Sequence, residues 1–476
     1  MHILIVILFI TFFTDVIQLF EVGGYGVNLI DFAFLSIFIV FLKRLIWDGI
    51  ELKFSVHPGL IFLIAIVFAA LLSGLTPLFK GSTPQMIQYL KTTVHFLYLV
   101  FFTFICAFYK IETRTWTAFV KVWLILSIFI NVFGIYQIFA RAYDLPLAWL
   151  QFTNVSLTGR SSEDIESVKQ LSLHYGSFFR ATSIFTEPSA LASFNILIQV
   201  FLIVPFVQKM KPFFKSKLLN IIIFVISLIT LFLCFSMTGF VGMALIIGGI
   251  FIFHWSRRLI PFVAGFLGSI IILFATDSFI ESYSGVSVIS LFSKRLSGVF
   301  SETQSTAGES IGVRLKSAEV GIDIWERHFL IGSGLGLTAY NNREGVEFGD
   351  FSFVAALAEM GLTGLLAFVG IFISLFIITG RFLLRIKEKD DIPDDLKRWS
   401  GILFFMMLHL FLINFISGNN LVSFVLWLLV GVIFANIRQI YIETGKKTYL
   451  IKFLKKPLKI SLNQSILRYL RLNTKK

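Results

Sequence analysis

The sequence has few charges and few cysteines. Charged residues make up 14% of its 476 residues, whereas roughly 25% is typical of soluble globular domains. The two cysteines, Cys106 and Cys234, lie inside apolar runs with no CxxC or Cys/His spacing, which excludes a disulfide framework and a cysteine metal site. The sequence also lacks an HExxH motif and a Walker pattern. We therefore expect no metal ion and no cofactor.

Apolar residues are abundant instead. They make up 57% of the chain, with 57 Phe, and about twenty apolar residues suffice for a helix to cross a bilayer. The sequence predicts an all-α polytopic membrane protein with about twelve transmembrane helices. The apolar runs occupy residues 3–20, 27–46, 58–75, 86–108, 116–140, 184–207, 218–235, 239–253, 259–276, 351–379, 400–416 and 420–437.

The net charge of +13 is concentrated in alternate loops and in the C-terminal tail. Because cytoplasmic loops carry an excess of Lys and Arg, this alternation places both termini in the cytoplasm. We interpret the basic tail as a segment held against anionic lipid headgroups and expect no nucleic-acid partner. The chain then divides into N-terminal helices (1–140), a first long outer loop (141–183), central helices (184–276), a second long outer loop (277–350), C-terminal helices (351–441) and the tail (442–476).

The second outer loop contains an amphipathic pattern over 313–328. Its polar residues recur at helical spacing and are Lys316, Glu319, Asp323 and Glu326. Arg314 belongs to the opposite, apolar stripe, so its guanidinium is predicted to project towards whatever the helix packs against. An Arg at the start of a helix can equally snorkel to the interface.

Arg180 and Glu187 bracket an apolar segment where the first outer loop enters the next span. Ionisable groups at a membrane boundary are costly, which makes them functional candidates. Pro188 can occupy the first turn of a helix. Glu187 is either a functional carboxylate or only the cap of that helix.

A glycine-rich segment follows the amphipathic helix, with Gly332, Gly334 and Gly336, and precedes Asp350 and Glu359. Such glycines can cradle a phosphate or simply form a close turn. Without a Walker pattern or a complete dinucleotide fingerprint, the close turn is favoured.

These segments resemble the O-antigen polymerase and O-antigen ligase superfamily. The resemblance rests on the order of an Arg followed by Glu-Pro, a second Arg, a Trp, a glycine turn and the segment Leu357–Gly364. Members transfer a glycan from a polyprenyl-pyrophosphate carrier at the outer face of the bacterial cytoplasmic membrane. The motifs lie between about residues 180 and 364.

The resemblance implies that Arg180 and Arg314 hold the donor pyrophosphate, with Arg327 a possible third cation. Arg suits this role because it stays charged and binds phosphate oxygens bidentately. Asp350 occupies the position of the ligase His, which favours a polymerase; Asp350 or Glu187 would orient or deprotonate the acceptor hydroxyl. Two further residues are weaker candidates for pyrophosphate or sugar contacts: Lys91 and His174.

The sequence-based hypothesis is a metal-independent glycosyltransferase that polymerises lipid-linked oligosaccharide repeats into exopolysaccharide, capsule or O-antigen. Its donor and acceptor would both be polyprenyl-pyrophosphate-linked oligosaccharides, and its partners could include a flippase and a chain-length regulator. Two alternatives remain open at this point. One is a ligase of the same superfamily that transfers finished glycan to lipid A core or protein, and the other is a lipid-linked glycan flippase.

Overall fold

The computed structural model of the protein describes most of the chain. The described residues are 1–14, 17–22, 25–48, 57–152, 168–170, 174–175, 178–254, 256–285, 287, 289–290, 293, 310–338, 352–385, 392–416 and 421–444. Asp350 and the tail beyond Thr444 lie outside them. For Arg314 and His174 the backbone is described, but the side chain is not.

Each of the twelve predicted apolar runs contains a helix in the part of the chain that the structure describes. The helices are α1 (His2–Thr11), α2 (Leu29–Lys43), α3 (Pro58–Ser73), α4 (Leu75–Lys80), α5 (Thr83–Phe108), α6 (Thr113–Ala142), α8 (Pro188–Val207), α9 (Lys217–Leu233), α10 (Met237–Phe253), α11 (Ile260–Ala275), α12 (Asp277–Ser284), α14 (Ser310–Arg327), α16 (Ser352–Arg385), α17 (Asp394–Ile416) and α18 (Phe424–Glu443), with single turns η1 (Phe12–Thr14), η2 (Arg44–Asp48) and η4 (Arg257–Leu259).

Strands are few and short. Three antiparallel pairs occur among the described residues: β1 (Phe20–Val22) with β2 (Tyr25–Val27), β3 (Gln151–Phe152) with β4 (Val168–Lys169), and β5 (His174–Tyr175) with β6 (Phe178–Phe179). The protein is therefore a mostly helical membrane protein, as predicted.

Seven helices in the described part of the chain are long and apolar enough to cross a membrane. They are Pro58–Lys80, Thr83–Phe108, Thr113–Ala142, Pro188–Val207, Ser352–Arg385, Asp394–Phe415 and Phe424–Glu443. The predicted number of about twelve is not confirmed, because α1, α2, α9, α10 and α11 are only 10 to 17 residues long. At about 1.5 Å per residue, 17 residues extend roughly 25 Å, less than the roughly 30 Å hydrocarbon core.

The first predicted span, 3–20, is wrong in its second half. Helix α1 ends at Thr11, and Phe20 instead pairs with Val27 in the β1–β2 hairpin. Two glycines separate Val22 from Tyr25 in the sequence, and two-residue hairpin loops favour this composition. Apolar character alone did not reveal the turn.

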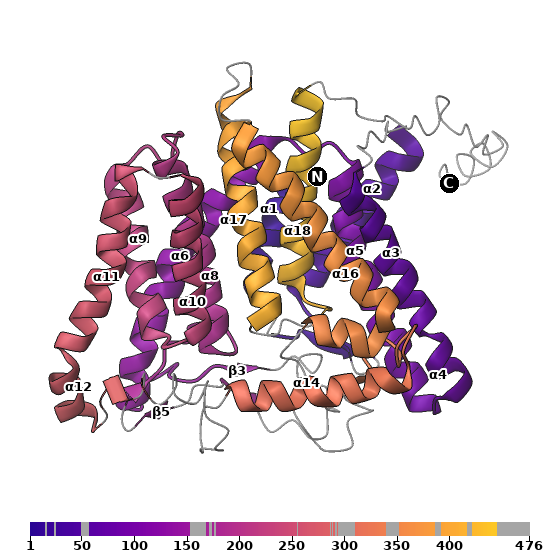
Figure 1. The fold of residues 1–476 in the computed structure, drawn as a ribbon, viewed down its shortest axis with the longest axis horizontal. Helices are drawn as coiled ribbons and strands as arrows, with labels where there is room; N and C mark the ends of the chain where they lie inside the picture. The colour runs from indigo at the N-terminus through magenta and orange to yellow at the C-terminus, as the bar shows by residue number, and fades with distance from the viewer. Residues whose placement is uncertain are drawn as a thin grey trace, which may run out of the picture.

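The long helices form a bundle in which helices distant in sequence are neighbours (Figure 1). Helix α16 packs against α3 and α17, α18 packs against α5, and α8 packs against α9, α10 and α17. Helix α14 differs from these helices because it runs across the end of the bundle instead of along it (Figure 1).

Hydrogen bonds and connections between helices show which residues lie at each end of the bundle. At one end, which we call the terminal end, His2 bonds to Thr115 at the start of α6 (2.6 Å), and Arg398 donates to Thr117 and to the carbonyl of Lys211. The other end carries α14 and the connection after α6, and we call it the loop end. The loop end is the one predicted to face outwards.

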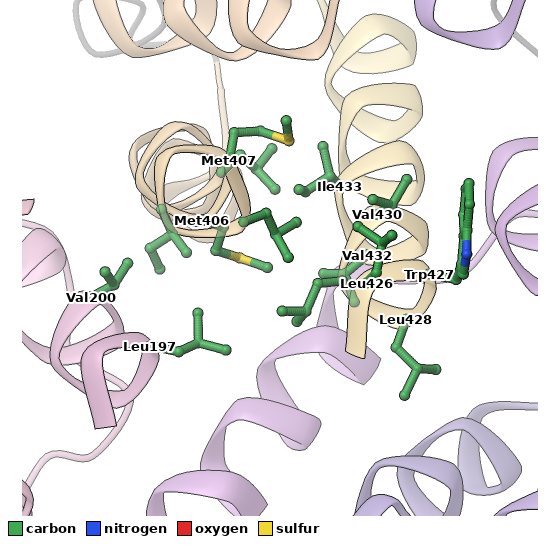
Figure 2. Packing of buried hydrophobic residues seen from close by; sticks show 14 of the residues in the cluster. Leu197, Val200, Met406, Met407, Leu426, Trp427, Leu428, Val430, Val432 and Ile433 are labelled. Carbon is green, nitrogen blue, oxygen red and sulfur yellow. The ribbon is translucent and has the colours of Figure 1, made fainter. Parts of the chain in front are cut away.

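One hydrophobic core extends through the bundle, and part of it lies between α8, α17 and α18. Figure 2 shows Leu197 and Val200 of α8 on the side of α17 that carries Met406, whereas Met407 of α17 extends towards Ile433 of α18. All five side chains are almost completely buried. This packing holds the helices that carry the loop-end residues in fixed positions.

Candidate functional site

Arg180 lies at the loop end, eight residues before the start of α8, and is 7% exposed. Its Nε donates to the carbonyl of Cys234 (2.8 Å), the residue that caps α9. The next residue, Ala181, donates its backbone N–H to the carbonyl of Leu233 (3.1 Å). The segment that carries Arg180 is thus fastened to the end of α9.

Ser183 continues this segment in a strained conformation. Its φ is +53°, in the left-handed region that residues other than glycine rarely adopt. The Ser183 hydroxyl donates to the carbonyl of Ile130 on α6 (2.6 Å), and its own carbonyl accepts from Gln170 (2.5 Å). Backbone strain held by surrounding contacts is frequent at functional sites.

A second buried arginine, Arg141 at the end of α6, holds Arg180 in place. Its Nη1 donates to the carbonyl of Arg180 (2.7 Å), and its Nε donates to the carbonyl of Ala148 (2.9 Å). Its Nη2 donates to the side chains of Gln170 (2.6 Å) and Thr182 (2.5 Å). One guanidinium therefore links the end of α6 to three other segments of the loop end.

The partners of Arg141 are all neutral, and none of its hydrogen bonds in the described part of the chain goes to a carboxylate. Its guanidinium also lies over the ring of Trp149, 4.3 Å from the centroid. Arg141 and Arg180 are both buried, so the loop end contains two buried guanidinium groups. Guanidinium groups are suited to binding phosphate oxygens.

Glu187 and His174 lie next to Arg180 in the chain or in the sheet. Glu187 occupies the position before α8, with Pro188 in the first turn as predicted. Its side chain accepts no capping bond from the backbone and instead accepts from the Ser189 hydroxyl in the first turn of α8. The backbone of His174 pairs with Phe179, the residue before Arg180.

The glycine turn after α14 packs directly against the backbone of α16. The N–H groups of Ser333 and Gly334 donate to the carbonyls of Ala358 and Glu359, both at 2.9 Å. Helix α16 is interrupted there, because Gly361 has a non-helical backbone with φ +67°. A Cβ on Gly332 would overlap the backbone of Glu359, which explains why glycine is needed.

The carboxylate of Glu359 fills this turn. It accepts from the Thr338 hydroxyl and from the backbone N–H groups of Gly336 and Thr338. The N–H groups that could cradle a phosphate are therefore bound to the chain's own carboxylate and carbonyls. The phosphate-cradle alternative is wrong, and the favoured alternative, a close turn, is what the structure contains.

The turn also connects α4 and α5 to α14. Thr76 donates to the carbonyl of Gly332 (2.7 Å), and Gly336 lies directly against Thr92 of α5. Lys91, the neighbour of Thr92, is half-buried at this junction. It lies beside the glycine turn, whereas Arg180 lies beside α9.

Helix α14 confirms the helix predicted at 313–328, apart from its last residue. The polar face of this helix is exposed and consists of Lys316, Glu319, Asp323 and Glu326. Arg314 and Arg327 are thirteen residues apart, which corresponds to about 20 Å along a helix. Arg327 is bound to Asp323 in an ion pair. The described residues thus do not bring Arg327 to the same place as Arg314.

Arg327 belongs instead to a basic group near α4. Burial, followed by the positive charges of Lys80 and Arg327, lowers the pKa of His328. A lowered pKa favours the neutral form of His328 at pH 7. This group lies where α14 approaches α4.

No family model and no curated protein matches the chain. The resemblance to O-antigen polymerases and ligases therefore rests on the quoted residues alone. Sequence reasoning missed Arg141 and its partners Gln137 and Gln170. The available signal was the one-turn spacing of Gln137 and Arg141 at the end of a transmembrane run, but an Arg at that position is ordinarily attributed to the membrane boundary.

Proposed function

We propose that the protein is a membrane glycosyltransferase that polymerises polyprenyl-pyrophosphate-linked oligosaccharide repeats at the outer face of the bacterial cytoplasmic membrane. The observation that carries this proposal is the buried Arg180 at the loop end, anchored through its Nε to Cys234 and through its carbonyl to Arg141. A fixed guanidinium that needs no rearrangement is suited to stabilising charge that develops on a leaving pyrophosphate.

In this reaction an acceptor hydroxyl of one lipid-linked glycan attacks the anomeric carbon of another. The new glycosidic bond forms as the bond from that carbon to the pyrophosphate oxygen breaks, and polyprenyl pyrophosphate leaves. The hydroxyl proton passes to a carboxylate, for which Glu187 and Asp350 are the candidates. Arg180 and Arg314 bind the pyrophosphate, and the activated donor supplies the driving force.

The proposal includes a topology of twelve crossings with both termini in the cytoplasm. The positive residues of the terminal end, such as Lys211 and Arg398, support this orientation under the positive-inside rule. The loop end then meets the lipid-linked glycan on the outer side. The shorter helices α1, α2, α9, α10 and α11 would cross where neighbouring lipid thins or where the crossing is completed by flanking residues.

The proposal is tested by reconstituting the purified protein in proteoliposomes with a lipid-linked repeat unit. We expect the wild type to form products longer than one repeat and Arg180→Lys to lose most chain growth. Lysine keeps the charge but lacks the planar fork that binds two phosphate oxygens and reaches the Cys234 carbonyl. Product length is measured by gel electrophoresis of the labelled glycan.

Arg327→Ala is the matched control, because Arg327 is exposed and paired within its own helix. It should retain chain growth, and equal losses in Arg180→Lys and Arg327→Ala would contradict the assignment. Accumulation of finished polymer on its carrier in cells lacking the protein would instead indicate the ligase. Transport of lipid-linked repeats without chain growth would indicate the flippase.

A further inference from the structure

A series of fully buried polar side chains runs through the middle of the bundle, between α6, α8 and α9. We call it the polar seam. Each of its members is 0% exposed, although helices in this region are surrounded by apolar side chains. The members are Ser127 and Asn131 of α6, Asn195 and Gln199 of α8, and Ser227 and Thr230 of α9.

Packing contacts place these residues at one interface. A Cβ on Gly134 of α6 would lie 3.3 Å from Leu191 of α8 and 3.5 Å from Thr230 of α9. Asn131 lies one turn below Gly134, and Asn195 lies one turn below Leu191, each step leading away from the loop end. The two asparagines are therefore at similar depth on helices that touch each other.

Gln199, one turn further along α8 than Asn195, shows which helix this side of α8 faces. Its Nε2 donates to the Ser227 hydroxyl (2.6 Å) and to the carbonyl of Phe224 (3.1 Å), both on α9. The face of α8 that carries Asn195 and Gln199 thus turns from α6 towards α9. The polar seam lies where these three helices meet.

Five polar atoms of the seam have no hydrogen-bond partner among the described residues. They are Oδ1 and Nδ2 of Asn131, Oδ1 and Nδ2 of Asn195, and Oε1 of Gln199. An unsatisfied buried polar group costs about 1–3 kcal/mol, and lipid offers no replacement partner. Such a concentration needs a ligand that can form hydrogen bonds.

Two other buried asparagines donate from their amide NH₂ group within their own helix, while their Oδ1 atoms have no partner among the described residues. Asn414 donates to the carbonyl of Leu410 (2.7 Å), and Asn436 donates to the carbonyl of Val432 (2.8 Å). Asn131 and Asn195 make no such bond to the preceding turn. Their carboxamides therefore depend on a partner from outside their own helix.

We propose that Asn131 and Asn195 bind ordered water inside the polar seam. Each carboxamide presents both donors and an acceptor. A cation would satisfy only the oxygens and an anion only the NH₂ groups, whereas water satisfies both. Buried water usually makes about three hydrogen bonds to polar groups that would otherwise be unsatisfied, and the seam supplies them. This site is independent of the proposed transferase activity.

Radiolytic hydroxyl labelling in ¹⁸O water, read by mass spectrometry, tests the site on the full-length protein in nanodiscs. Bound water produces radicals in place, so we expect ¹⁸O incorporation at Leu191, although this side chain is 0% exposed. Met406, which is equally buried in the apolar core, should stay unlabelled despite its greater reactivity. Absence of label at Leu191 in the wild type would overturn the proposal.

The double variant Asn131→Leu/Asn195→Leu provides the second measurement. It removes the polar groups, so the labelling at Leu191 should fall several-fold while labelling of exposed residues is unchanged. Asn436→Leu is the matched control, since this asparagine is buried but bonded within α18, and it should leave the labelling at Leu191 as in the wild type. Undiminished labelling in a folded double variant would contradict binding by these amides.

Discussion

Arg141→Ala is expected to lower the free energy of unfolding by about 3–5 kcal/mol, because it removes the group that links the end of α6 to three other segments of the loop end. The carbonyls of Ala148 and Arg180 would lose their charged donor, as would the side chains of Gln170 and Thr182. Thermal unfolding of the purified protein in detergent should show a clearly lower midpoint. If the function proposed above is correct, chain growth should fall as well, since the backbone of Arg180 loses its anchor.

Two variants separate the contribution of this network from that of charge. Arg141→Lys keeps the charge but cannot reach acceptors on several sides at once, so it should be nearly as destabilised as Arg141→Ala. Arg114→Ala removes an arginine from the other end of α6, where the side chain is 76% exposed and paired with Glu112. It should change the midpoint little. Equal midpoints for Arg141→Ala and Arg114→Ala would contradict the structural role of Arg141.

Gly332→Ala is expected to have a similarly large effect, for a steric reason. The φ of Gly332 is +77°, and an added Cβ would overlap the backbone of Glu359 and Met360. The backbone of α16 at Glu359 and Met360 cannot move away without breaking the hydrogen bonds that Ser333 and Gly334 donate to this helix. Strain and overpacking together should cost about 3 kcal/mol or more. Limited proteolysis should then cleave the 310–338 segment faster than in the wild type.

Gly285→Ala is the matched control for Gly332→Ala. Gly285 has a similar φ of +70°, but an added Cβ would meet nothing within 4 Å. This variant therefore carries only the conformational strain, about 1–2 kcal/mol, and α14 should stay attached to α16. If both variants were equally sensitive to proteolysis in the 310–338 segment, the close contact with Glu359 would not be the reason for the glycine.

Several features of the fold and the site could be predicted from local patterns. Hydrophobic runs located the helices, and the polar spacing of Lys316, Glu319, Asp323 and Glu326 located α14. Arg180 was recognisable because an arginine at a membrane boundary is costly wherever it occurs. Hydrophobicity did not predict where each helix ends, because an apolar residue such as Phe20 is equally suited to a membrane helix and to a hairpin.

The sequence by itself determined that the protein is helical, membrane-embedded and furnished with ionisable groups at one end of its bundle. Only the tertiary structure decided the partners of those groups. It bound Arg141 to Gln170 and Thr182, placed Gly332 against Glu359, and brought Asn131 and Asn195 to one interface. Periodicity is a property of single helices, whereas these contacts depend on the rotation and register of helices that are distant along the chain.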